Sequence, residues 1–106
     1  SGASPAPERV KLSMQAHSGY FSERCFTLLE GQRLAYQVHA GQPVDFNVHH
    51  HPPEGSTTYP DRLRIESRHS NGFTARSGGE YCFMATNPAS RPQPFDVIVD
   101  YQLFDS

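Results

Sequence analysis

Alternation of apolar and polar residues along short runs is the feature that most constrains the fold of this chain. Apolar residues at every second position lie on one face of an extended strand, whereas a helix needs a spacing of three or four. No window of the sequence shows a convincing helical stripe. The alternating runs cover positions 10–14, 34–38, 44–48, 63–65, 73–75, 81–85 and 95–103, and a short mixed run lies at 24–29.

Turn-forming residues separate these runs. Gly, Pro and Asn occur at 30–32, 40–43, 52–55, 70–72, 77–79 and 87–88. The last run is the clearest core strand, because its apolar register continues for five positions from Phe95 to Leu103, with Ile98 as the one apolar residue on the other face. Seven or eight short strands at roughly ten-residue spacing predict an all-β, antiparallel sandwich or barrel.

The length and charge of the chain restrict its organisation and its partners. A chain of 106 residues has the usual size of one domain, which we place at residues 9–106, after a small and Pro-containing flexible leader at 1–8. Nine Lys and Arg and eleven Asp and Glu are dispersed, so nucleic acid is not an expected partner. The longest apolar run is far below the ~20 residues of a membrane span, so we expect none in this chain.

A series of short motifs resembles the GOLD (Golgi dynamics) domain. In order they are Cys25-Phe26, Gly31-Gln32-Arg33-Leu34, Tyr36-Gln37-Val38, Val44-Asp45-Phe46, Pro53-Glu54-Gly55, Phe73, Gly79-Glu80-Tyr81-Cys82-Phe83 and Asn87. They lie within residues 23–102 and are similar to the lumenal module of the emp/gp-type cargo receptors and to small exported bacterial proteins of the same kind. The resemblance implies a β-sandwich that binds proteins or cargo outside the cytoplasm.

Two features depart from the cargo receptors. Those proteins place the second cysteine three residues after the tyrosine, whereas Cys82 follows Tyr81 directly, which keeps the strand face but changes the neighbours. The histidine run His49-His50-His51 is also foreign to the cargo receptors. Both features fit the exported bacterial branch better, so we expect a periplasmic, secreted or otherwise extracytoplasmic protein.

The two cysteines have three interpretations. Cys25 and Cys82 are 57 positions apart, and both take the register opposite to the apolar one. A disulfide between them would stabilise the fold by ~4 kcal/mol in the chain-entropy model, and we favour this interpretation. Two unpaired, partly buried thiols or two thiolate metal ligands are the alternatives.

The histidine run predicts a metal site. In an extended strand, His49 and His51 share the polar face with Asp45 and Asn47, whereas His50 falls in the apolar register, where we expect the strand to end. Imidazoles two positions apart can converge on one ion. Together with Met84 and His39 or a cysteine, they would offer nitrogen and sulfur ligands suited to copper or zinc. An exposed polar strand end without metal is the alternative, and His17 and His69 are expected at the surface.

Catalysis is not predicted. The sequence contains no Gly-x-Ser-x-Gly elbow, no phosphate-binding glycine loop and no His-Glu-x-x-His motif. The expected function is therefore binding, either of a transition metal at His49 and His51 or of a protein partner. For a protein partner, Tyr59 in the loop after the histidines is the candidate aromatic anchor.

Overall fold

The computed structural model describes residues 5–105, and all of its regular structure is β-strand. The predicted all-β class is therefore confirmed. Eight strands follow one another: β1 (Glu8–Met14), β2 (Phe21–Leu28), β3 (Arg33–Ala40), β4 (Val44–His51), β5 (Thr58–Ile65), β6 (Arg68–Thr74), β7 (Gly79–Thr86) and β8 (Phe95–Phe104).

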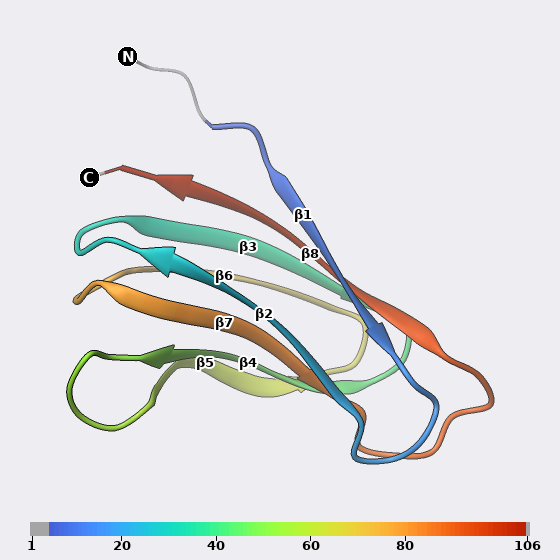
Figure 1. Ribbon diagram of the computed structural model, residues 1–106. Coiled ribbons are helices and arrows are strands. Elements are labelled where there is room, and N and C mark those ends of the chain that lie inside the picture. The colour runs from blue at the N-terminus through green and yellow to red at the C-terminus, as the bar shows by residue number, and fades with distance from the viewer. Residues whose placement is uncertain (1–4, 106) are drawn as a thin grey trace.

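The strands form two antiparallel sheets that pack face to face (Figure 1). One sheet has the order β1-β8-β3-β6 and the other has the order β2-β7-β4-β5. Every pairing is antiparallel. The sandwich that the resemblance implied is thus the observed architecture, and its eight strands agree with the seven or eight that the sequence predicts.

The apolar register of each run forms the layer between the sheets. Val97 and Val99 of β8 are fully buried, whereas Ile98 between them is only partly buried and takes the other face, as the alternation predicts. Phe46 of β4 and Phe83 of β7 lie near the centre with ring centroids 6.3 Å apart. Burying large side chains of this kind contributes roughly 1.5–3 kcal/mol each.

Strand β4 does not end at His50, contrary to the expectation from its register. It continues through His51, paired with β7, and His50 is only 4% exposed. Its ring stacks on Tyr81 of β7 with centroids 4.0 Å apart and planes 3° apart. The apolar register therefore accepts a histidine here because an aromatic ring covers it.

His69 also departs from its predicted surface position. It lies opposite Val38, whose side chain is in the core, and its ring Nε2 is 2.7 Å from Asp61 Oδ2. The Tyr36 hydroxyl donates to the same carboxylate oxygen at 2.5 Å. These three side chains connect the two sheets along the edge where β5 and β6 lie.

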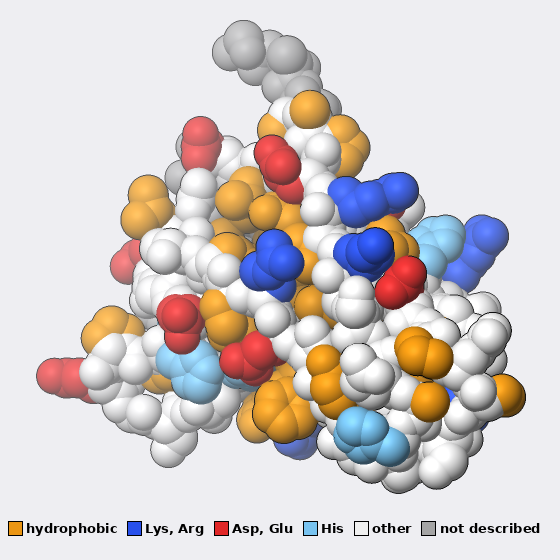
Figure 2. Space-filling view, turned by 45° about the vertical axis from the view of Figure 1, so that its right-hand side comes forward, with side chains coloured by type: hydrophobic (Ala, Val, Ile, Leu, Met, Phe, Trp, Pro, Cys, Tyr) orange, Lys and Arg blue, Asp and Glu red, His pale blue; other side chains and the backbone are white. Residues whose placement is uncertain are grey.

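The predicted leader lies partly outside the described residues, which begin at Pro5. Its last residue, Glu8, already belongs to β1, and the Pro5 carbonyl accepts a hydrogen bond from Gln102 Nε2 at 2.6 Å. Residues 5–105 contain no helix long and apolar enough to cross a membrane. On the face seen in Figure 2, acidic, basic and apolar side chains are interspersed.

Candidate metal centre

The outer face of the β2-β7-β4-β5 sheet holds the predicted site. Because β7 pairs with β2 on one side and with β4 on the other, facing residues form rows across the three strands. The successive rows are Glu23, Met84 and Asn47; then Cys25, Cys82 and His49; then Thr27, Glu80 and His51.

The middle row contains a disulfide. Cys25 and Cys82 lie directly opposite each other with Cα atoms 4.0 Å apart, and their sulfurs are bonded. The structure therefore agrees with the favoured interpretation of the cysteines. In this state neither sulfur is a thiolate, so neither is a strong metal ligand. Cys82 is fully buried, whereas Cys25 is partly exposed.

The two imidazoles of the polar register meet beside this disulfide. The ring centroids of His49 and His51 are 4.8 Å apart, with the planes nearly perpendicular at 84°. One ring nitrogen of each histidine and the sulfur of Cys82 all lie within 4.8 Å of one another. His51 is exposed and His49 is 6% exposed, so an ion could reach the pair from the side of His51.

The neighbours of His49 fix its orientation. Its Nδ1 lies 2.8 Å from Asn47 Oδ1, so the ring donates its Nδ1 proton to that amide oxygen. The unprotonated Nε2 then lies 3.6 Å from Glu23 Oε2. Metal-bound histidines commonly use the second ring nitrogen in this way, as a donor to an oxygen that holds the ring in place.

The surroundings also set the protonation of His49. Burial lowers the pKa of His49, and the like charge that His51 can carry lowers it further. Glu23 and Glu80 oppose this effect, but the net shift is downward. A lowered pKa means that the imidazole is neutral at pH 7, which is the form that binds metal ions.

The other predicted ligands lie at different distances from this pair. Met84 faces Asn47 in the adjacent row, diagonally from His49 on the same sheet. His39 lies in β3 of the opposite sheet, is exposed on its outer face, and is not brought to His49 and His51. The predicted set is therefore reduced to His49 and His51, with Met84 nearby.

Tyr59 flanks the same site. Its ring centroid is 6.1 Å from that of His49, and the guanidinium of Arg62 lies over it at 4.4 Å. Nearly half of Tyr59 is exposed. The β4–β5 register shifts between Val48 and His50, and this irregularity places the start of β5 against His49.

A pocket of about 480 Å³ is lined in part by Tyr59. It is mostly aromatic and apolar, and it lies at the edge where β5 and β6 diverge. Its lining consists of His50, Pro52, Thr58, Tyr59, Pro60, Phe73, Thr74, Arg76, Ser77 and Tyr81. Tyr59 thus lies beside His49 and also lines this pocket.

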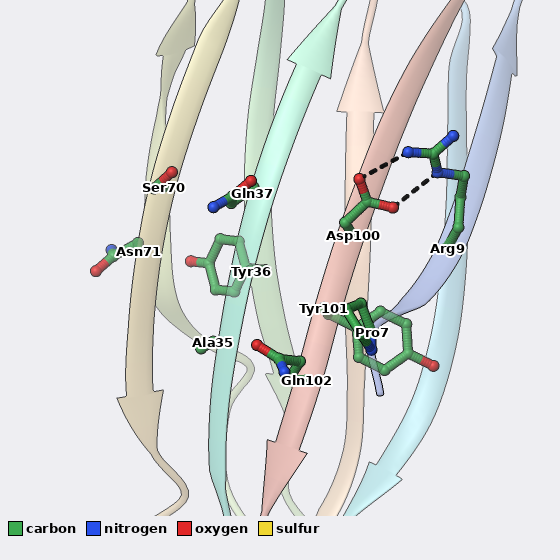
Figure 3. A pocket seen from close by; sticks show the side chains of 10 residues that line it. All are labelled: Pro7, Arg9, Ala35, Tyr36, Gln37, Ser70, Asn71, Asp100, Tyr101 and Gln102. Carbon is green, nitrogen blue, oxygen red and sulfur yellow. Dashed lines mark hydrogen bonds and ion pairs between the residues drawn. The ribbon is translucent and has the colours of Figure 1, made fainter. Parts of the chain in front are cut away.

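A larger hollow, of about 750 Å³, lies on the other sheet (Figure 3). In it Arg9 makes a two-pronged ion pair with Asp100, with Nε 2.8 Å and an Nη 3.0 Å from the carboxylate oxygens. The side-chain amide of Gln102 donates a hydrogen bond to the Pro5 carbonyl. These polar groups have partners within the protein, and the hollow is remote from the histidine pair.

Comparisons with solved structures place the chain among small β-sandwiches. The periplasmic inhibitor of g-type lysozyme from Aeromonas hydrophila, PliG, superposes with a TM-score of 0.69 at 12% identity, over 93% of this chain and 87% of that one. Salmonella Typhimurium PliG gives 0.62 at 12% identity, over 93% and 88%. The fold is shared. The Yersinia pseudotuberculosis-derived mitogen gives 0.58 at 13%, over 94% and 89%.

Sequence comparisons do not assign the chain to a family. No family model and no curated protein sequence matches the chain. The likeness to the two PliG proteins concerns the fold, because only about one residue in eight is shared with either of them. The resemblance to the GOLD domain therefore stays a prediction.

Sequence reasoning missed Glu23 as a neighbour of the histidines. Glu23 is two positions before Cys25 and so takes the same strand face, but its approach to His49 depends on β2 and β4 flanking β7. That strand order is not encoded in any local pattern. A prediction that Cys25 and Cys82 are cross-strand partners would have placed Glu23 on the sheet face that holds the site. The approach of His49 to Glu23 requires in addition that β4 lies on the other side of β7.

Proposed function

We propose that this protein is a non-enzymatic binding domain whose His49/His51 pair takes a divalent transition metal, copper or zinc. One observation carries the proposal: a ring nitrogen of each histidine lies within 4.8 Å of the other. A small shift of the exposed His51 side chain would let one ion lie ~2.0 Å from both nitrogens, which is the distance at which imidazoles bind these ions.

The donor set also fits the ion class. Two imidazoles with the Glu23 carboxylate, 3.6 Å from His49 Nε2, make a nitrogen and oxygen set that zinc and copper both accept. Met84 lies diagonally from His49 on the same sheet, and a thioether ligand from it would favour copper. The site is open to solvent at His51, so water would complete the coordination.

The test is a calorimetric titration of the oxidised protein with Zn²⁺ and, separately, with Cu²⁺. We expect one ion per chain for wild type and no measurable binding for the double variant His49→Ala, His51→Ala. The matched control is His17→Ala, His39→Ala, which removes two exposed histidines far from the pair and should bind as wild type does. Equal binding by the two double variants would contradict the proposal.

We infer an extracytoplasmic location for the same protein. Structural disulfides persist in oxidising compartments and are rare in the cytosol. Cys25 and Cys82 form such a bond, and the two PliG neighbours are named as periplasmic proteins. Fractionation of the native cells should recover the protein outside the cytoplasm with no titratable thiol. Recovery of the reduced protein from the cytosol would contradict this location.

Protein recognition through Tyr59 is the second candidate. Tyr59 is an exposed aromatic side chain beside an aromatic pocket, and such residues commonly anchor protein interfaces. The PliG neighbours are inhibitors of g-type lysozyme, which makes that enzyme the first probe. We expect inhibition of g-type lysozyme that Tyr59→Ala weakens at least tenfold. Phe21→Ala, which removes another exposed aromatic ring, is the control. Equal inhibition by the two variants would exclude Tyr59 as the anchor.

A further inference from the structure

The histidine pair and the disulfide occupy one site. His49 faces Cys82 directly across the β4–β7 ladder, and Cys25 faces Cys82 across the β2–β7 ladder. One ring nitrogen from each of His49 and His51 and the Cys82 sulfur lie within 4.8 Å of one another. Glu23, Cys25 and Cys82 meet the same criterion. The disulfide therefore withholds the Cys82 sulfur from an ion bound at the two imidazoles.

We propose that thiol–disulfide exchange at Cys25–Cys82 regulates metal affinity, because it frees the Cys82 thiolate to join the two imidazoles of His49 and His51 in a tighter site. This inference rests on the proposed metal function and names its regulation. Cysteine and histidine side chains are preferred ligands of Zn²⁺, and Glu23 or water would complete a tetrahedral arrangement with His49, His51 and Cys82. In the oxidised protein the same ion has only the imidazoles, the Glu23 carboxylate and water.

The different exposure of the two cysteines determines which sulfur the reductant attacks first. A thiolate of a dithiol reductant attacks the sulfur of Cys25, because Cys25 is partly exposed and Cys82 is fully buried. The electron pair of the disulfide bond leaves with Cys82. The second thiol of the reductant then releases Cys25, and the reductant becomes a disulfide. Overall, one dithiol gives two electrons and two protons to the protein.

The released Cys82 sulfur is already beside both imidazoles. When a divalent ion binds, the Cys82 thiol loses its proton and becomes a ligand, so one proton is released for each ion. The ladder of eight residue pairs from Phe21 opposite Thr86 to Leu28 opposite Gly79 holds β2 on β7 without the disulfide. The donors therefore stay together in the reduced chain, and little rearrangement is needed.

Co²⁺ is the probe for the test, because thiolate ligands give it a charge-transfer band in the near ultraviolet. Wild type is reduced with dithiothreitol, freed of it by anaerobic gel filtration, and titrated with Co²⁺ and then with competing Zn²⁺. We expect the thiolate band only in the reduced protein and a Zn²⁺ affinity about 100-fold or more above that of the oxidised protein. No band, or equal affinities, would overturn the proposal.

Two variants separate the thiolate from the loss of the disulfide. Cys25→Ser frees Cys82 without any reductant, so we expect it to show the thiolate band with His49, His51 and Cys82 as ligands. The double variant Cys25→Ser, Cys82→Ser lacks the disulfide equally but should show no band. A band of equal strength in both variants would overturn the proposal. Unfolding of both variants and of the reduced protein, with metal present, would also overturn it, since the regulation needs paired strands.

The same measurements distinguish the redox regulation from the proposed function. If the oxidised protein binds Zn²⁺ through His49 and His51 and reduction adds nothing, the regulation fails and the proposed function stands. If the oxidised protein binds nothing and the reduced protein binds tightly, the proposed function fails for the oxidised state and the regulation stands. In the reduced protein, the double variant His49→Ala, His51→Ala should bind Zn²⁺ more weakly than wild type does.

Discussion

Asn87 shows how much of a loop one buried amide can hold. The side chain is fully buried, and its Nδ2 group lies 3.1–3.2 Å from the carbonyls of Gln15, Ala16 and His17. Its backbone N–H also donates to the Tyr20 carbonyl. Asn87 therefore joins the segment after β7 to the connection between β1 and β2, which have no strand pairing with each other.

We predict that Asn87→Ala lowers the free energy of unfolding by about 2 kcal/mol or more, because it removes a fully buried amide that donates to three backbone carbonyls. Urea denaturation monitored by circular dichroism measures the change. Ser18→Ala is the control, since Ser18 makes one exposed hydrogen bond, to the Pro88 carbonyl, in the same region. Its effect should stay within about 0.5 kcal/mol. Equal effects of the two substitutions would contradict the assigned role of Asn87.

Asp61 is a second residue whose surroundings have a measurable effect, in this case on the pKa of its side chain. Its side chain is 10% exposed and accepts from both Tyr36 and His69. Burial raises the pKa of Asp61, but the hydrogen bonds from Tyr36, His69 and Asn71 outweigh it, so the pKa lies below its usual range. Burial, with help from the Asp61 carboxylate, raises the pKa of Tyr36 well above its usual range.

A lowered carboxyl pKa in the folded state gives a defined pH dependence. The stabilisation is fully present above the unfolded pKa, near 4, and is lost as the pH falls through the lower folded value. We predict that Asp61→Asn costs about 2 kcal/mol at pH 7 and that the difference from wild type shrinks below about pH 4. Urea denaturation across this pH range measures it. Asp96→Asn, at an exposed aspartate, should cost little at any pH. A constant difference for Asp61→Asn would contradict the assignment.

At the scale of elements, β4 and the start of β7 depend on each other. Gly79 opens β7 with φ of +144°, a conformation that side chains disfavour. A Cβ there would lie 2.9 Å from the ring Nε2 of His50 and 3.3 Å from the His51 carbonyl. The glycine thus lets the backbone of β7 approach the end of β4 that carries the histidine pair.

We predict that Gly79→Ala lowers the free energy of unfolding by more than about 2 kcal/mol and weakens metal binding at His49 and His51. Gly55→Ala is a matched control, because Gly55 also has a positive φ, of +98°, but open space around its Cβ position. Its cost should be only about 1 kcal/mol, with metal binding unchanged. Denaturation and calorimetry measure the two effects. Equal costs would show that contact with β4 contributes nothing.

At the scale of the whole molecule, the disulfide constrains the chain across most of its length. It joins residues 57 positions apart, and the enclosed segment contains the whole of β3, β4, β5 and β6. Closing a loop of that length removes conformational freedom from the unfolded chain. The disulfide lies within one sheet, and the two sheets are held together by the apolar layer between them and by the hydrogen bonds of Asp61 at one edge.

We predict that reduction lowers the free energy of unfolding by about 4 kcal/mol while the chain stays folded at 25 °C. Urea denaturation with and without dithiothreitol measures the loss, and the double variant Cys25→Ser, Cys82→Ser should reproduce it without reductant. The double variant should then show no further response to dithiothreitol, which controls for any direct effect of the reductant. An unchanged midpoint for the reduced wild type would show that the disulfide does not stabilise the protein.

The sequence alone determined the fold class, the strand count and the outward direction of His49 and His51, because a strand has a side-chain period of two and each run carries it locally. It also favoured the Cys25–Cys82 pair through register and spacing. Only the tertiary structure decided that β7 lies between β2 and β4. That order brings Glu23 and the disulfide to the histidines and leaves His39 on the opposite sheet. Strand order depends on contacts between distant segments, which no local alternation records.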